Sequence, residues 1–171
     1  MRVRGFTLIE LVAVIVVLSV LMGVAIPRYL DHAQRASATR IAADLKTLSN
    51  ASLSYKRDTG YWPADGAPGL FTSLSRYLSQ DTMLMATGGT PLGRDTIYDY
   101  TGPPMKAEDG TGWDGAMVSL VTMQGGVWMH RDWTSREASI IDRADAIFDD
   151  GSPSTGAAQR WTGSFTRLLN P

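Results

Sequence analysis

One carboxylate, Glu10, lies inside an otherwise apolar run that extends from Phe6 to Ile26. On membrane-insertion scales an acid at the centre of a bilayer-spanning helix costs about 2.5–3.5 kcal/mol. A cationic group a few ångströms away would return several kcal/mol at an intermediate effective dielectric. The sequence therefore marks Glu10 as a residue that needs a positively charged partner.

A second set of residues that could do chemistry is an acidic cluster near the C-terminus, consisting of Asp142, Asp145, Asp149 and Asp150. Carboxylate oxygens are the ligands that Ca²⁺ prefers. The spacing lacks the alternating Asp and Asn of an EF-hand loop, and Asp149-Asp150-Gly151 is also typical of a turn. A calcium site and a solvated turn both stay open, and no other cofactor is expected.

Enzymatic chemistry finds little support in the sequence. Cysteine is absent, and the two histidines, His32 and His130, are far apart along the chain. A catalytic metal site or a Cys–His nucleophile is therefore not expected, and no nucleophile-elbow pattern occurs. The formal net charge of −1 gives no electrostatic reason to bind nucleic acid.

The apolar run itself is long enough to cross a bilayer, which takes about 20 residues of helix. Arg2 and Arg4 precede it without an acid, so the N-terminus is predicted to stay cytoplasmic and the rest to be exported. A secretory signal peptide would have a shorter core and a small-residue cleavage site, which the sequence after Pro27 does not offer. An ordinary membrane anchor would give Glu10 no role.

The stretch GFTLIELV, which begins at Gly5 after a short basic leader, resembles the N-terminal signal of type IV pilins and type II secretion pseudopilins. The resemblance implies that a prepilin peptidase cuts between Gly5 and Phe6 and methylates the new N-terminus, so that Phe6 becomes N-methylphenylalanine. The new amine would be the partner of Glu10, either within one helix or between neighbouring subunits. In the second case the pair would set the register of a helical bundle.

A single helix is predicted from about Phe6 to Arg57, with a kink at Pro27 and an end before Gly60 and Pro63. One face of its second half carries Ile41, Leu45, Leu48 and Tyr55. The predicted parts of the chain are a leader (1–5), a transmembrane and assembly half of the helix (6–27), an amphipathic half (28–58) and a periplasmic head (59–171).

The head is predicted to be α+β, with a small antiparallel sheet packed on the amphipathic half of the helix. This is also the type IV pilin-like fold that the resemblance implies. Gly69–Leu78 is expected to form a short helix with Leu70, Leu74, Tyr77 and Leu78 on one side. The expected strands are Thr96–Thr101, Ala116–Met123 and Gly126–Trp133, followed by a helix over Ser135–Ile147 with Ser135 as N-cap and an edge strand in the tail. The five tryptophans are either core residues or a binding surface.

The resemblance implies a structural subunit of a filament. A pseudopilin of a type II secretion system is favoured for two reasons. The segment YKRDTGYWP resembles the end of the first helix in major pseudopilins, and this chain has no cysteine, whereas many true pilins carry a disulfide. A type IV pilin or minor pilin for adhesion, motility or DNA uptake is the alternative, and a membrane-anchored binding module is a third. The implied partners are further copies, other pilin-like subunits, the prepilin peptidase, an assembly platform in the bacterial inner membrane, and membrane lipid.

Overall fold

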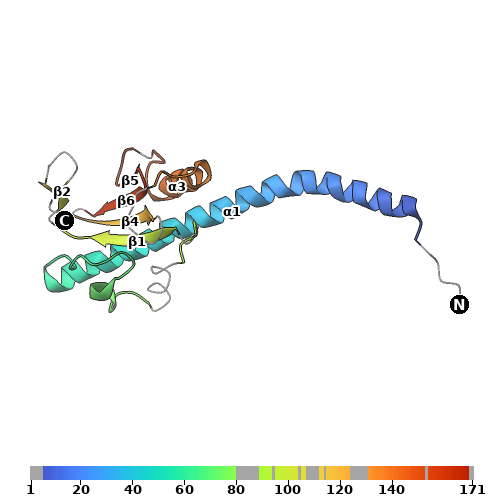
Figure 1. Cartoon of the computed structure of the whole chain (residues 1–171). Helices are drawn as coiled ribbons and strands as arrows, with labels where there is room; N and C mark the ends of the chain where they lie inside the picture. Colours follow the sequence, from blue (N-terminus) through green and yellow to red (C-terminus); the bar gives the residue numbers. More distant parts are fainter. Residues whose placement is uncertain are drawn as a thin grey trace. The chain divides into compact units, whose positions relative to one another are not determined.

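A computed structural model describes residues 6–79, 89–93, 95–103, 105–106, 112–113, 115–123, 131–152 and 154–169 of the 171-residue chain. The chain divides into two units, Met1–Ala36 and Ser37–Pro171. Helix α1, Leu8–Thr59, contributes to both units, and the second unit also holds a small antiparallel sheet (Figure 1). The predicted α+β, type IV pilin-like fold is therefore confirmed.

Helix α1 is continuous through Pro27. A proline costs one backbone hydrogen bond there without ending the helix, and the predicted kink stays a prediction. The helix ends at Thr59, two residues beyond the predicted end. Gly60 follows with φ of +79°, and its N–H donates to the Lys56 carbonyl at 2.8 Å. Glycine takes this left-handed conformation without steric cost, which is why it terminates helices.

The second half of α1 buries the predicted apolar stripe. Ile41, Leu45 and Leu48 are at most 1% exposed, and Tyr55 is partly buried against the same core. Two serines are also fully buried beside this stripe. Ser49 and Ser52 donate their hydroxyls to carbonyls four residues earlier, at 2.7 and 2.9 Å. The helix therefore satisfies its own buried polar groups, as burial requires.

The main sheet has the strand order β1-β4-β6-β5, with every pair antiparallel. Its strands are β1 (Thr96–Thr101), β4 (Ala116–Thr122), β5 (Ala158–Trp161) and β6 (Ser164–Leu169). A separate pair joins β2 (Met105–Lys106) to β3 (Gly112–Trp113). The register places Tyr98 opposite Leu120, and Leu120 opposite Phe165. All three are at most 1% exposed, so they form the centre of the sheet's core face.

Helix α3, Ser135–Phe148, and the short 3-10 helix η1, Thr72–Leu74, complete the core. One apolar cluster joins Leu45 of α1 and Leu74 of η1 to the sheet and to Ile141 of α3. A hydrogen bond fastens the helix to the sheet, because the Tyr98 hydroxyl donates to Asp44 Oδ2 at 2.8 Å. Apolar burial and this bond together hold α1 against the sheet.

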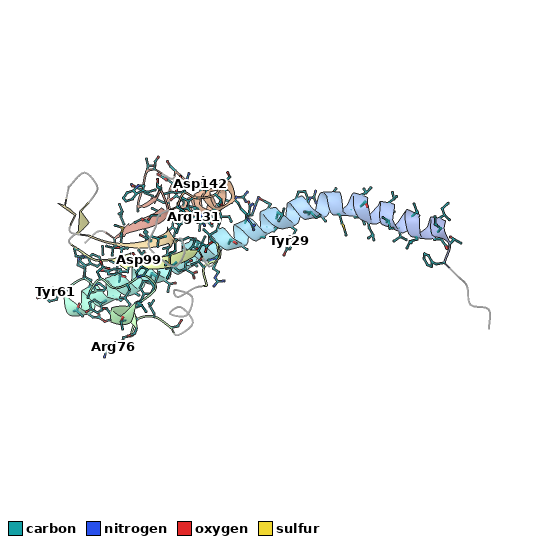
Figure 2. All side chains as sticks on the ribbon, viewed as in Figure 1. Tyr29, Tyr61, Arg76, Asp99, Arg131 and Asp142 are labelled. Carbon is teal, nitrogen blue, oxygen red and sulfur yellow. The ribbon has the colours of Figure 1, made fainter. Side chains whose placement is uncertain are left out.

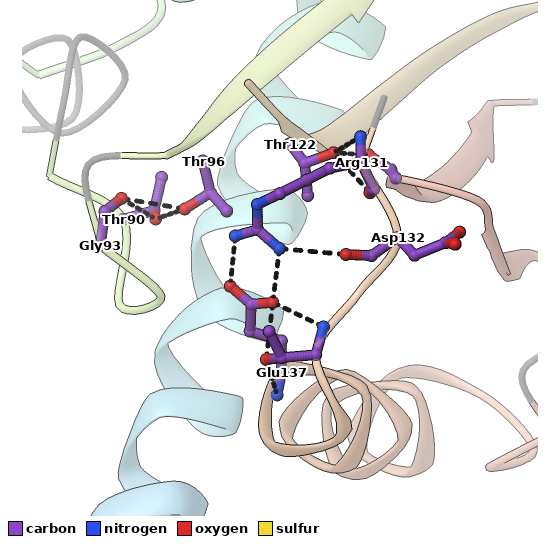
Figure 3. Close-up of polar contacts among 9 residues, drawn as sticks. Thr90, Gly93, Thr96, Thr122, Arg131, Asp132 and Glu137 are labelled. Carbon is purple, nitrogen blue, oxygen red and sulfur yellow. Dashed lines mark hydrogen bonds and ion pairs between the residues drawn. The ribbon is translucent and has the colours of Figure 1, made fainter. Parts of the chain in front are cut away.

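The start of α3 contains a polar clamp that the sequence reading did not identify (Figure 3). Thr134, and not Ser135 as predicted, is the N-cap, and it forms a capping box with Glu137. The Arg131 guanidinium donates to both oxygens of Glu137, at 2.8 and 2.7 Å. The backbone N–H of Arg131 donates to the Thr122 hydroxyl at 3.1 Å, and that hydroxyl donates to the Arg131 carbonyl at 3.0 Å. The clamp therefore ties β4 to the start of α3.

The predicted helix over Gly69–Leu78 is wrong apart from the single turn η1. The Gly69 N–H donates to the Tyr98 carbonyl at 3.0 Å, which draws the beginning of this segment to the edge of β1. Leu70, predicted on the buried side, is 58% exposed, whereas Phe71 is buried. The contact with a distant strand therefore overrides the local helical pattern.

The other strand predictions have mixed outcomes. Thr96–Thr101 is confirmed, and Ala116–Met123 ends one residue early. The strand predicted over Gly126–Trp133 lies mostly outside the described residues, and its last three residues form no strand. The tail forms a hairpin of β5 and β6, in which β5 is the predicted edge strand and β6 is an additional, interior strand. Burial of Phe165 and Leu169 explains the interior position.

Candidate functional site

The first turn of α1 holds the residues predicted to direct processing and assembly. Gly5 lies outside the described residues, and Phe6 is 77% exposed. The Thr7 N–H and the Thr7 hydroxyl each donate to Glu10 Oε2 at 2.8 Å. The Glu10 N–H reaches the Thr7 hydroxyl at 3.4 Å. These contacts form a capping box, in which Thr7 and Glu10 satisfy each other's backbone donors.

The capping box gives Glu10 a structural role that the sequence reading missed, although the spacing Thr7-Leu-Ile-Glu10 carries its signature. Both hydrogen bonds from Thr7 end on Oε2. Within the described residues Oε1 accepts no hydrogen bond. Glu10 can therefore cap its own helix with one oxygen while the other stays available to a cation.

The residues after Glu10 present an apolar surface on every side of the helix. Every residue from 11 to 26 is exposed, and examples are Val20 at 67% and Leu21 at 60%. The polar hydroxyl of Ser19 finds a partner within the helix, because it donates to the Ile15 carbonyl at 2.8 Å. Within the described part of the chain α1 is the one helix that is long and apolar enough to cross a membrane. An exposed surface of this kind requires lipid or other apolar helices around it.

The acidic cluster lies at the end of α3 and in the loop that follows, and most of its carboxylates have partners. Asp142, labelled in Figure 2, accepts from Arg160 Nε at 2.9 Å. Asp149 accepts from the N–H of Ala157. Asp150 accepts from the Ser152 N–H and the Thr155 hydroxyl, both at 2.8 Å.

Glycines shape this loop as well. Gly151 has φ of +74°, which fits the turn predicted at Asp149-Asp150-Gly151. Gly156 has φ of +81°, and a Cβ on it would overlap the Asp149 carboxylate. The loop is therefore held by its own hydrogen bonds and by close backbone approach.

Asp145 differs from the other three carboxylates. It is 0% exposed, and neither of its oxygens has a hydrogen-bond partner among the described residues. Burial, together with the carboxylates of Asp150, Asp149 and Asp142, raises the pKa of Asp145 from 3.8 to about 6. Ionising this group in the folded protein is therefore unfavourable.

The predicted calcium ligands do not fit a calcium site as they lie. Calcium takes six to eight oxygen ligands, whereas three of the four carboxylates are engaged by Arg160, by backbone N–H groups or by Thr155. Across the described residues no group of three or more His, Asp or Glu side chains is arranged to hold a metal ion. His32 lies on an exposed part of α1, and His130 is outside the described residues.

We expect Asp145→Asn to stabilise the protein at pH 7.5 and not at pH 4. The folded state holds the Asp145 proton more tightly than the unfolded state, so stability falls as pH rises from 3.8 to about 6. Two pKa units correspond to about 3 kcal/mol. The buried amide would also lack partners, which leaves a net gain of about 1–2 kcal/mol at pH 7.5, or about 2–8 °C in Tm.

Thermal unfolding of the full chain at both pH values, with calcium and with EDTA, checks this expectation. A lower Tm for Asp145→Asn at pH 7.5 in EDTA would contradict it. If calcium stabilises the wild type and this gain disappears in Asp145→Asn, the calcium alternative holds instead.

The chain is similar to known proteins in its N-terminal segment, and with some of them the similarity continues into the head. Residues 1–26 match the family described as the prokaryotic N-terminal methylation motif. The type II secretion system core protein G of Klebsiella michiganensis is 30% identical over 107 residues, which cover 58% of this chain and 74% of that protein. The Escherichia coli K12 protein of the same name is 35% identical over 60 residues, or 35% of this chain and 41% of that protein.

A second group of similar proteins consists of pilins. A fimbrial protein of Pseudomonas aeruginosa is 26% identical over 129 residues, which cover 73% of this chain and 82% of that protein. The type IV major pilin PilE of Neisseria gonorrhoeae is 37% identical over 62 residues, or 36% of this chain and 37% of that protein. No solved structure matches the chain.

Proposed function

Because the chain belongs to the family of type IV pilins and type II secretion core protein G, whose members are pilus-like structural subunits, we propose that it is a pseudopilin. In this proposal the subunits polymerise in the periplasm into a fibre of a type II secretion system. The observation that carries it is the similarity to core protein G, which runs past the N-terminal signal over 107 residues.

The N-terminal helix explains how such a subunit moves from membrane to fibre. Its exposed apolar surface, which includes Val20 and Leu21, suits a bilayer before assembly. In the fibre the same surface would contact the helices of neighbouring subunits. Because apolar contacts with lipid are exchanged for apolar contacts with helices, extraction changes the free energy little.

Glu10 would select the correct position of each incoming helix. Its Oε2 is used by Thr7, which leaves Oε1 for the positively charged amine that cleavage creates at Phe6 of a neighbouring subunit. A buried charge pair of this kind fixes register better than apolar packing does. The prepilin peptidase and an inner-membrane platform are the further partners that this pathway requires.

A type IV pilin is the second candidate. It is favoured by the Pseudomonas aeruginosa fimbrial protein, which aligns with a larger share of this chain than core protein G does, 73% against 58%. The two candidates differ in where the assembled protein is found, because a pilus extends beyond the cell surface and a pseudopilus does not.

Mass spectrometry of the N-terminus tests the processing step. The mature protein is expected to begin with N-methylated Phe6, and the variant Gly5→Val is expected to keep Met1, since a side chain at this position would obstruct cleavage. An uncut wild-type chain, or a cut after the apolar run, would contradict the proposal.

Location and secretion then separate the two candidates. A pseudopilin is expected in membrane fractions and not in sheared surface fibres, and deletion of its gene is expected to stop export of folded proteins. Abundant processed protein in sheared fibres with normal export would establish the pilin instead.

A further inference from the structure

A surface cleft of about 590 Å³ opens beside the end of β5. Its lining residues are more than a hundred positions along the chain from Phe6 and Glu10. Its lining combines two indole rings, a guanidinium, a carboxylate and two hydroxyls, contributed by Asp132, Trp133, Ser154, Arg160, Trp161 and Thr162. The cleft is wide open to solvent, and what it shares with ligand sites is the combination of aromatic walls with a few convergent polar groups.

The two tryptophans are held in different ways. Trp133 packs against the core cluster, and its Nε1 donates to the Trp161 carbonyl at 3.0 Å. Trp161 is the last residue of β5 and is 52% exposed. The Trp133 ring is therefore fixed by packing and a hydrogen bond, while the Trp161 residue at the end of β5 is about half exposed to solvent.

The polar groups of the cleft are partly unused, and the Asp132 carboxylate is the one charge that is left without a counter-charge among the described residues. Arg160 is held by Asp142 at 2.9 Å, which neutralises its charge and fixes its position. The side chains of Asp132, Ser154 and Thr162 are exposed and form no hydrogen bond with any described residue. The cleft therefore offers hydrogen-bonding groups without the excess positive charge that a phosphate or an acidic ligand would need.

We propose that this cleft binds a neutral, β-linked oligosaccharide. A pyranose ring with equatorial hydroxyls has two apolar C–H faces and a rim of hydroxyls. The faces match the indoles of Trp133 and Trp161, and the rim matches the carboxylate of Asp132 and the hydroxyls nearby. Because all these groups belong to the head, this activity goes beyond filament formation and does not depend on it.

Isothermal titration calorimetry of the full chain tests the proposal, with cellotriose and chitotriose as probes. The detergent must have no sugar head group, since a maltoside would compete for the cleft. Saturable binding of at least one probe is expected. Trp161→Ala is expected to weaken binding at least about tenfold, because aromatic anchors dominate such sites. Asp132→Asn is expected to weaken it by a smaller factor.

Tyr61→Ala is the matched control, because Tyr61 is a 78% exposed aromatic residue that does not line the cleft. It should bind as the wild type does. The proposal is overturned if neither sugar binds, if Tyr61→Ala loses as much affinity as Trp161→Ala, or if both cleft variants retain wild-type affinity. If circular dichroism shows that Trp161→Ala is unfolded, Asp132→Asn decides alone, since its exposed side chain makes no contact that folding requires.

Discussion

Replacement of Glu10 by valine is expected to abolish filament assembly while cleavage and membrane attachment continue. Valine removes the one charge in the apolar run, so insertion into the membrane becomes more favourable. In the proposed assembly step an incoming subunit then lacks the charge pair with the Phe6 amine of a neighbour, and apolar contacts alone do not distinguish one register from another. The measurement is the fraction of the protein in cross-linked or sheared filaments, with membranes and N-terminal mass as references.

Glu10→Gln separates the two roles of this side chain. The amide oxygen can still accept from the Thr7 N–H, so the capping box is retained, but the charge is lost. If pairing with the amine is what assembly needs, Glu10→Gln fails as Glu10→Val does. If Glu10→Gln assembles normally, helix capping is the role of Glu10. Normal assembly of Glu10→Val would refute both explanations.

Of the substitutions proposed in the head, Glu137→Gln is expected to cause the largest loss of stability, about 3 kcal/mol, or about 6–12 °C in Tm. Glu137 accepts two short hydrogen bonds from Arg131 and also caps α3 through Thr134. The substitution leaves the Arg131 guanidinium, which is 26% exposed, without its counter-charge. Thermal unfolding at pH 7 measures the change.

Asp142→Asn is the matched control, because it breaks a more exposed ion pair with Arg160, in which the carboxylate is 40% exposed. Exposed pairs contribute at most about 1 kcal/mol. Equal losses in the two variants would show that the Arg131–Glu137 clamp has no special role.

The same clamp makes stability depend on pH. The hydrogen bonds from Arg131, with those from Thr134, lower the pKa of Glu137 from 4.5 to about 2. The unfolded chain therefore binds more protons between these values, and stability falls as the pH decreases from 4.5 to 2. Above pH 4.5 the contribution is fully present. In Glu137→Gln this decrease is expected to be absent, and an identical acid profile in both proteins would contradict the assignment.

The sequence predicted the features that depend on neighbouring residues. The N-terminal signal, the extent of α1 and the burial of Ile41, Leu45 and Leu48 all follow from local composition and helical periodicity. Both capping boxes also have a sequence signature, Thr7-Leu-Ile-Glu10 and Thr134-Ser-Arg-Glu137, but were not recognised. The spacing from Thr134 to Glu137, and not Ser135, marks the N-cap of α3.

Only the tertiary structure decided which distant groups meet. The Gly69–Tyr98 contact replaced a predicted helix, and the interior position of β6 depends on pairing with β4, far away in sequence. Burial left Asp145 without partners while its neighbours found them. Trp133 and Trp161 are 28 residues apart and meet only because α3 and the loop after it return the chain to the sheet. Sequence alone determined the long apolar N-terminal helix, because its apolar residues are consecutive along the chain. The polar contacts of the head required the fold, because each joins residues that only packing brings together.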